Sequence, residues 1–301
     1  MRRTVPHLML AGAALFWAGN FVTARALGDA WTPLTLNAAR WLVASAVLVP
    51  FTWTSLREHA GPLARHAPWL LSLSLTGVVG FQTLLYLALQ GTTVVNAAII
   101  AATTPLVVAL GARLAFGEPF TRLQALGTAL SLVGALVVVV RGDPTALASV
   151  RLGGGELWML AAVPCWAAYS LLLMRGPHQV PRVTLVSATG LVGVPFTLLL
   201  AALDLTLGAE VRVTAPSLAG AAYIGVFAGA LAFVFWNRGV AAIGPSRASL
   251  FLHLMPLFAA LLGVTFLAEP LAGYHALGAA LVVSGVALAS RRAVCRQGGG
   301  R

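Results

Sequence analysis

The sequence predicts an all-α integral membrane protein whose ten transmembrane helices form two inverted-topology repeats of five helices each. Three observations lead to this fold class: the scarcity of charge, the recurrence of long apolar stretches, and the alternation of arginines between those stretches. Of the 301 residues, 59% are hydrophobic and only 9% are charged, whereas a soluble domain carries about 25% charged residues. So few charges cannot cover the surface of a soluble protein of this length.

Each apolar stretch is long enough for about 20 helical residues, which span about 30 Å of hydrocarbon. Backbone polar groups in lipid must be satisfied within their own segment, so these stretches should be helices. We find no alternating segments of about 10 residues, which would indicate a barrel. The predicted spans are 7–26, 33–51, 68–88, 94–115, 121–141, 156–175, 183–203, 216–237, 247–267 and 273–290. The longer connections are 52–67 and the glycine-rich 142–155, which is typical of a linker.

The arginines set the predicted orientation, because cytoplasmic loops of membrane proteins carry an excess of basic residues. With the N-terminus in the cytoplasm, most arginines fall in inside segments, and the outside segments hold only Arg25, Arg141, Arg151 and Arg212. Most acidic residues fall outside. An even number of spans then places both termini, including a tail at 291–301, in the cytoplasm.

An internal repeat divides the chain into two five-helix units. Four pairs of residues keep one constant offset: Pro105 and Pro256, Glu118 and Glu269, Gly127 and Gly278, and Gly134 and Gly285. Upstream, Phe16-Trp17-Ala18-Gly19 echoes Cys165-Trp166-Ala167-Ala168 at an offset that differs by two residues. We therefore expect a first repeat at 1–141, an extracytoplasmic linker at 142–155 and a second repeat at 156–290. Five is odd, so the second repeat enters the membrane in the opposite sense, which is a recurring transporter design.

These motifs resemble the drug/metabolite transporter superfamily, and specifically its ten-helix group built from two EamA-type repeats. The resemblance covers residues 7–290 and rests on Trp17-Ala18-Gly19-Asn20-Phe21, Arg40, Pro105 with Gly117-Glu118, Pro256 with Ala268-Glu269, and Trp236-Asn237-Arg238-Gly239-Val240. It implies a multi-pass transporter of the cell inner (plasma) membrane, often an exporter of amino acids or related metabolites. It does not fix the substrate, because the shared motifs are mostly architectural.

Polar and aromatic side chains at helical spacing indicate which faces of the helices point into the protein. They line either a central cavity between the repeats or simple interhelical contacts, which are worth about 0.6 kcal/mol each. The candidate substrate-binding residues are Trp17, Asn20, Arg40, Gln82, Tyr86, Thr103, Trp166, Tyr169, Trp236 and His253. Pro105 and Pro256 are candidate kinks for gating, because helix breaks at matching places in two repeats indicate a transport site.

Arg40 and His253 are the ionisable candidates inside the predicted spans. An intramembrane Arg costs at least about 2.5 kcal/mol on insertion scales, so Arg40 should either pair with Asp29 on the outer side or hold a substrate carboxylate; we expect the pairing. We expect His253 to be neutral and hydrogen-bonded at a helix interface rather than to shuttle protons.

Two further motifs predict structural roles. The carboxylate of Glu118 should cap the N-terminus of the following helix, where the positive end of the helix dipole favours negative charge. Gly127 and Gly134, like Gly278 and Gly285, lie on one helix face. They should permit close packing where the halves, or two protomers, meet.

The sequence also excludes several function classes. The net charge of +11 comes from scattered arginines, with no basic stripe or RNA-binding motif, so no nucleic-acid partner is expected. Cys165 and Cys295 have no metal-ligand spacing, and we expect no metal, no cofactor and no catalytic residues. The expected partners are a small-molecule substrate and the lipid bilayer, and the protein should be a monomer or a homodimer. The alternatives are a carrier of sugars or nucleotide-linked sugars and, in a different class, an intramembrane enzyme acting on lipid-linked substrates.

Overall fold

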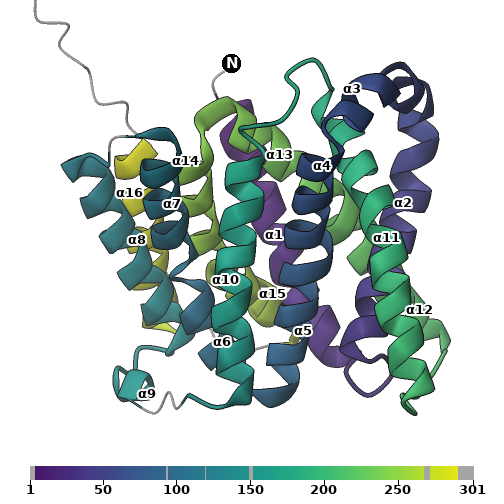
Figure 1. The fold of residues 1–301 in the computed structure, drawn as a ribbon. Coiled ribbons are helices and arrows are strands. Elements are labelled where there is room, and N and C mark those ends of the chain that lie inside the picture. Colours follow the sequence, from purple (N-terminus) through teal and green to yellow (C-terminus); the bar gives the residue numbers. More distant parts are fainter. Residues whose placement is uncertain (1–3, 93, 119, 149–151, 268–271, 291–301) are drawn as a thin grey trace, which may run out of the picture.

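The computed structural model describes residues 4–92, 94–118, 120–148, 152–267 and 272–290, and this part of the chain is helical throughout with short connections (Figure 1). The first half contains α1 (Val5–Ala26), α2 (Pro33–Glu58), α3 (Ala60–Arg65), α4 (Ala67–Ser74), η1 (Leu75–Gly80), α5 (Phe81–Gly91), α6 (Val94–Ala101), α7 (Thr104–Phe116) and α8 (Arg122–Val139). After α9 (Thr145–Ala148), the second half contains α10 (Gly154–Leu172), α11 (Arg182–Thr206), α12 (Ala215–Tyr223), η2 (Ile224–Leu231), α13 (Ala232–Ile243), α14 (Pro245–Ser249), η3 (Leu250–His253), α15 (Leu254–Leu267) and α16 (Gly273–Ser290).

Several of these elements join end to end, so the described part of the chain crosses the molecule ten times, as predicted. Nine helical segments of the described residues are long and apolar enough to cross a membrane, and a tenth, Gly273–Ala289, is a shorter apolar helix. The main deviation is at 52–67, which the sequence predicts as a connection. There α2 continues to Glu58 and α3 follows, because Pro50 lies inside α2 without ending it.

Side-chain caps fix where α2 and α8 begin. The Thr32 hydroxyl accepts a hydrogen bond from the Thr35 amide at the start of α2, and Thr121 and Gln124 form a capping box at the start of α8, which satisfies amides that have no partner in the first turn. The predicted cap by Glu118 is wrong, because this carboxylate instead accepts from the Ser246 hydroxyl of α14 at 2.8 Å. The matching segment around Glu269 lies outside the described residues.

The third transmembrane segment of each half contains a π-helix. The first is η1, with 6 residues, and the second is η2, with 8 residues. This difference of two residues explains why the repeat offset changes by two between the first and the fourth helix of each half. Equivalent positions are therefore related by one offset before the π-helices and by a second offset after them.

The fourth transmembrane segment of each half is interrupted near its predicted proline. In the first half, α6 ends at Ala101 and α7 restarts at Thr104, with Pro105 in its first turn. In the second half, the 3-10 helix η3 precedes α15, which contains Pro256 near its start. The first of these helices is thus broken rather than bent, whereas the second stays continuous but winds more tightly over the 4 residues of η3. Both places are called helix breaks below. A proline in a first turn removes no helical hydrogen bond, because that amide has no partner within the helix.

The two halves meet along α8 and α16, which lie side by side at one edge of the molecule (Figure 1). A Cβ atom added to Gly127 would lie 2.6 Å from the Gly285 carbonyl oxygen, and one added to Gly134 would lie 2.8 Å from that of Gly278. The backbones therefore approach each other closely at both glycine pairs. These glycines join the two halves within one chain.

Candidate functional site

A cavity lies between the two halves, beside the breaks of the fourth and ninth transmembrane segments. It has a free volume of about 120 Å³. For comparison, an engineered apolar cavity of about 150 Å³ accommodates benzene. Its lining comes from both halves: Trp17, Ala18, Phe21, Phe81, Gln82, Leu85, Ala98, Ala101, Ala102, Thr104, Ala135, Trp166, Leu252, His253, Met255, Pro256 and Ala259. The cavity is therefore predominantly apolar, with a few polar groups at fixed places, as is common for small-molecule sites.

His253 closes one side of the cavity by joining the two helix breaks. Its Nε2 lies 3.0 Å from the Ala102 carbonyl oxygen, and its Nδ1 lies 2.8 Å from the Ser131 hydroxyl of α8. A carbonyl oxygen can only accept, so Nε2 carries a proton and donates it. His253 and Ala102 also occupy equivalent positions in the two repeats, at the offset that relates Pro256 to Pro105. The imidazole is thus a hydrogen-bonded link close to the pseudo-twofold axis, as expected for an interface histidine.

Arg40, on α2, is fully buried and surrounded by neutral acceptors. Its Nη1 donates to Gln82 Oε1 at 2.9 Å, Asn20 Oδ1 at 3.1 Å and the Tyr86 hydroxyl at 3.2 Å, and its Nη2 donates to the Ala228 carbonyl at 2.8 Å. The predicted pairing with Asp29 is therefore wrong. The acceptors disperse the charge through hydrogen bonds, and no carboxylate among the described residues neutralises it.

The π-helix η2 supplies the main-chain acceptor of this network. The carbonyl of Ala228 accepts from Arg40 Nη2 and also from Trp17 Nε1, at 3.1 Å. A π-helical turn changes the i−4 pattern of hydrogen bonds, and such turns are frequent at functional sites. The guanidinium carbon of Arg40 also lies 5.7 Å from the centre of the Phe233 ring, just beyond η2, within the range of a cation–π contact.

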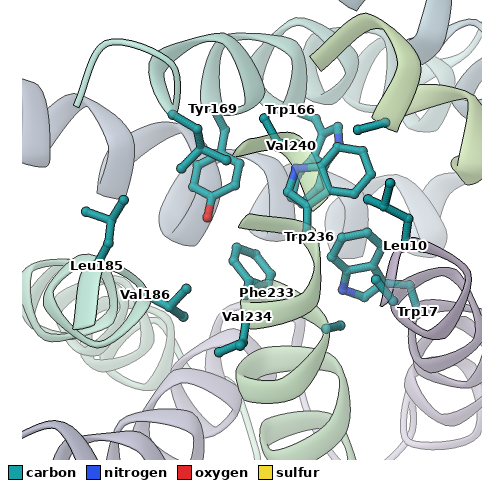
Figure 2. Close-up of a cluster of buried hydrophobic side chains, with 14 of the residues drawn as sticks. Leu10, Trp17, Trp166, Tyr169, Leu185, Val186, Phe233, Val234, Trp236 and Val240 are labelled. Atoms are coloured by element: carbon teal, nitrogen blue, oxygen red, sulfur yellow. The ribbon is translucent and has the colours of Figure 1, made fainter. Parts of the chain in front are cut away.

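A cluster of buried aromatic rings lies beside this network (Figure 2). Trp17 and Trp166 meet edge to face with centroids 5.0 Å apart, and Trp166 lies 5.3 Å from Trp236. Phe233 contacts both Trp17 and Trp166, and Tyr169 contacts Trp166 and Phe233. Trp17 and Trp166 are the sequence-equivalent tryptophans of the two repeats, so they meet across the pseudo-twofold axis.

Each half contains a hydrogen bond between an asparagine and a tyrosine, with the residue types exchanged. In the first half, the Tyr86 hydroxyl donates to Asn20 Oδ1 at 2.9 Å. In the second half, Asn237 Nδ2 donates to the Tyr169 hydroxyl at 3.0 Å. Asn20 is equivalent to Tyr169, and Tyr86 is equivalent to Asn237, at the two repeat offsets. The same connection between the first and third transmembrane segments is thus built twice, once within the hydrogen-bond network of Arg40 and once as a separate pair.

A second, more polar pocket of about 490 Å³ lies at the turn between α1 and α2, and its lining includes Asp29, Trp31 and Tyr86. Tyr86 borders this pocket, whereas Gln82, one helical turn earlier on α5, borders the central cavity. Both side chains are bonded to Arg40. The Arg40 network therefore separates the two hollow regions.

The structure divides the candidate residues into four groups. Those that line the central cavity are Trp17, Gln82, Trp166, His253 and Pro256. Those that form the network behind its wall are Asn20, Arg40 and Tyr86, and those confined to the aromatic cluster are Tyr169 and Trp236. Those outside the lining are Thr103, whose hydroxyl donates to the Ile100 carbonyl, and Pro105.

Sequence reasoning missed several residues of the site. Thr104, not Thr103, lines the cavity, and its hydroxyl donates to the Ala101 carbonyl at 2.6 Å. Phe233 lies beside the network, and Asn237 is buried and bonded to Tyr169; the repeat relation between Asn237 and Tyr86 was the available signal for the second. The Ala228 carbonyl accepts from Arg40 within a π-helix, and no residue pattern in the sequence predicts that π-helix.

Comparison with known proteins agrees with this architecture. Residues 4–140 and 153–291 match the EamA-like transporter family. The chain belongs to this family. The resemblance inferred from the sequence motifs is confirmed, and the protein is a multi-pass membrane transporter of the EamA type.

Individual EamA-type relatives cover nearly the whole chain. The uncharacterised transporter YyaM of Bacillus subtilis is 27% identical over 94% of this chain and 93% of its own. A protein of Streptantibioticus cattleyicolor, named as a probable terminal-alkyne amino-acid exporter, is 27% identical over 93% of this chain and 92% of its own. A crystal structure with a TM-score of 0.72 and 20% identity covers 94% of this chain and 96% of its own, which supports the fold.

Proposed function

We propose that the protein exports amino acids with small apolar side chains, or related amphipathic compounds, by alternating access through the cavity between its two halves. The observation that carries this proposal is the position of the cavity. It is lined by both repeats, at the breaks of the fourth and ninth transmembrane segments. Two similar halves of opposite orientation can exchange conformations and open such a cavity to one side and then to the other.

The size and lining of the cavity support this choice of substrate. A free volume of about 120 Å³ suits a branched aliphatic or small aromatic side chain better than a sugar ring with its many hydroxyls. Aromatic rings such as Trp17, Phe81 and Trp166 supply apolar contact area. The relative named as a probable terminal-alkyne amino-acid exporter is consistent with an amino-acid substrate. We further propose that the protein acts without catalysing a chemical reaction.

The proposal includes a location and an orientation. The distribution of arginines favours the inner membrane with both termini cytoplasmic. The turn between α1 and α2, with its polar pocket, then opens toward the outside. Substrate would enter from the cytoplasm and leave past Tyr86.

The test is uptake of radiolabelled L-leucine and L-valine into proteoliposomes, with and without a pH gradient. Trp166→Ala removes a ring from the cavity wall, whereas Trp158→Ala removes an exposed ring from the same helix. We expect saturable uptake that falls by about tenfold or more in Trp166→Ala, because burying a ring of this size is worth more than 1.4 kcal/mol. Uptake should be unchanged in Trp158→Ala. Absence of uptake for both amino acids, or equal loss in both variants, would contradict the proposal.

A further inference from the structure

We propose that the central cavity recognises its ligand through a carboxylate, or a group with the same charge and acceptors, and provides no counter-charge for an ammonium group. This inference rests on the proposed function and specifies its substrate class. It follows from a count of the hydrogen-bonding groups that remain available around the cavity. These are donors, and three main-chain carbonyls nearby already accept hydrogen bonds from side chains.

Gln82 is the first available donor. Arg40 has donors only, so the Gln82 atom that it contacts at 2.9 Å must be the oxygen, and the side-chain amide cannot be flipped. Gln82 lines the cavity, and with its oxygen held by Arg40, its NH2 group is the end left for a ligand. The positive charge of Arg40 lies directly behind this amide.

Trp166 is the second available donor. Its side chain is 2% exposed and lines the cavity, yet its Nε1 has no hydrogen-bond partner. Nε1 of Trp236, whose ring centre lies 5.3 Å from that of Trp166, also lacks a partner, but Trp236 is not among the residues that line the cavity. Buried donors are normally paired, and each unpaired one needs an explanation. The unpaired Nε1 of Trp166, together with the NH2 group of Gln82, therefore favours a ligand with acceptor atoms.

Three main-chain carbonyls near the cavity already accept hydrogen bonds from side chains. The Ala101 carbonyl accepts from the Thr104 hydroxyl, the Ala102 carbonyl accepts from His253, and the Ala228 carbonyl accepts from both Trp17 and Arg40. Among the described residues that line the cavity, none is acidic. An ammonium group would therefore lose its water and gain no carboxylate in return.

Arg40 makes the electrostatic potential at this wall of the cavity positive, which favours the same ligands as the available donors do. Arg40 is the charged residue of the network, and its four partners are neutral. In a low-dielectric surrounding its charge is screened weakly. A ligand anion would be attracted through Gln82, whereas a cation would be repelled.

The experiment compares four compounds that share one branched apolar body: 4-methylpentanoate, L-leucine, L-leucinamide and 3-methylbutylamine. Each is added to the purified full-length protein, and the apparent Kd is obtained from the rise in Tm with concentration. We expect 4-methylpentanoate to bind most tightly and L-leucine more weakly, because the ammonium group of L-leucine loses its water without gaining a counter-charge. The amide and the amine should bind about tenfold more weakly or worse, because they leave buried donors unpaired.

Three variants sharpen the test. Gln82→Glu keeps an acceptor for Arg40 but replaces the donor by a negative charge, and it should weaken the binding of 4-methylpentanoate by about tenfold or more. Trp166→Phe keeps the ring and removes one donor, and it should weaken the same compound while sparing the amine. Gln179→Glu makes the same change of residue type in an exposed connection. It should leave the Kd of 4-methylpentanoate unchanged.

The inference is overturned if the amide or the amine binds as tightly as 4-methylpentanoate, if both Gln82→Glu and Trp166→Phe bind it like wild type, or if none of the four compounds raises Tm. Its failure can be separated from that of the proposed function. Leucine transport together with equal binding of the amine would leave the proposed function standing and reject the carboxylate rule. Selective binding of 4-methylpentanoate without leucine transport would support the carboxylate rule and reject the proposed function.

Discussion

Arg40 is a buried cation that the protein keeps charged without an acidic partner. Four neutral oxygens from three other transmembrane segments surround it, and the arrangement needs both terminal nitrogens of a planar guanidinium. Arginine suits such a site better than lysine, because its donors are fixed in a fork and its charge is delocalised. The residue therefore organises Asn20, Gln82 and Tyr86 as well as carrying charge.

Arg40→Lys should separate these two roles. A lysine keeps the charge but cannot reach acceptors on both sides, so at least one buried oxygen loses its donor, at a cost of about 1–3 kcal/mol. We expect a lower Tm for the purified protein and loss of uptake. Arg57→Lys, on the exposed end of the same helix, is the control and should match wild type. An Arg40→Lys protein as stable as the control would show that the fork geometry is unimportant.

Residue types alone identified most of this site, but not its connections. Arg40, Gln82, Tyr86 and Asn20 were recognisable because polar side chains inside apolar spans must face the protein interior. The partner of Arg40 was mispredicted, because Asp29 is the acidic residue closest to Arg40 in the sequence. The observed acceptors come from other segments, and one is a backbone carbonyl, which the sequence does not distinguish from any other.

At the scale of elements, the helices are broken where the two halves meet, and the halves touch there through His253 and Ala102. The positions of the ten segments were predictable, because apolar length and charge in the connections are local properties of the sequence. The π-helices and the exact breaks were not predictable, because they depend on packing against neighbouring segments. Pro105 indicated that a break was near but not that the helix would stop at Ala101.

The close contact between α8 and α16 predicts that a methyl group added at the interface destabilises the protein. A Cβ atom at Gly285 would lie 2.5 Å from the backbone nitrogen of Ser131, and backbone atoms cannot move aside as a flexible side chain can. Gly285→Ala should therefore destabilise the protein by about 1–3 kcal/mol through overpacking. Gly273→Ala, on the same helix with nothing within 4 Å of the added atom, should be neutral. Thermal unfolding of the two variants measures the difference, and equal Tm values would contradict the close packing of these helices.

For the whole molecule, orientation in the membrane follows from charge and can be measured directly. In a protein with Cys165 and Cys295 replaced, a single cysteine is introduced as His66→Cys or as Glu210→Cys, both at exposed connections. The excess of arginine in the connections on the cytoplasmic side predicts that an impermeant thiol reagent labels Glu210→Cys in intact cells. It should label His66→Cys only after permeabilisation. The opposite pattern would invert the predicted topology and the proposed direction of export.

The exchanged asparagine–tyrosine pairs show what a single chain permits that two identical subunits would not. In a dimer of one five-helix chain, each residue near the axis would appear twice, so a buried arginine would bring a second one close to it. Here Arg40 and its counterpart Thr189 are each the eighth residue of their helices, α2 and α11, and only one of them is charged. Joining the halves covalently therefore allows a site whose two ends differ: a buried arginine occupies this position in one half and a threonine occupies it in the other, although both have the same backbone architecture.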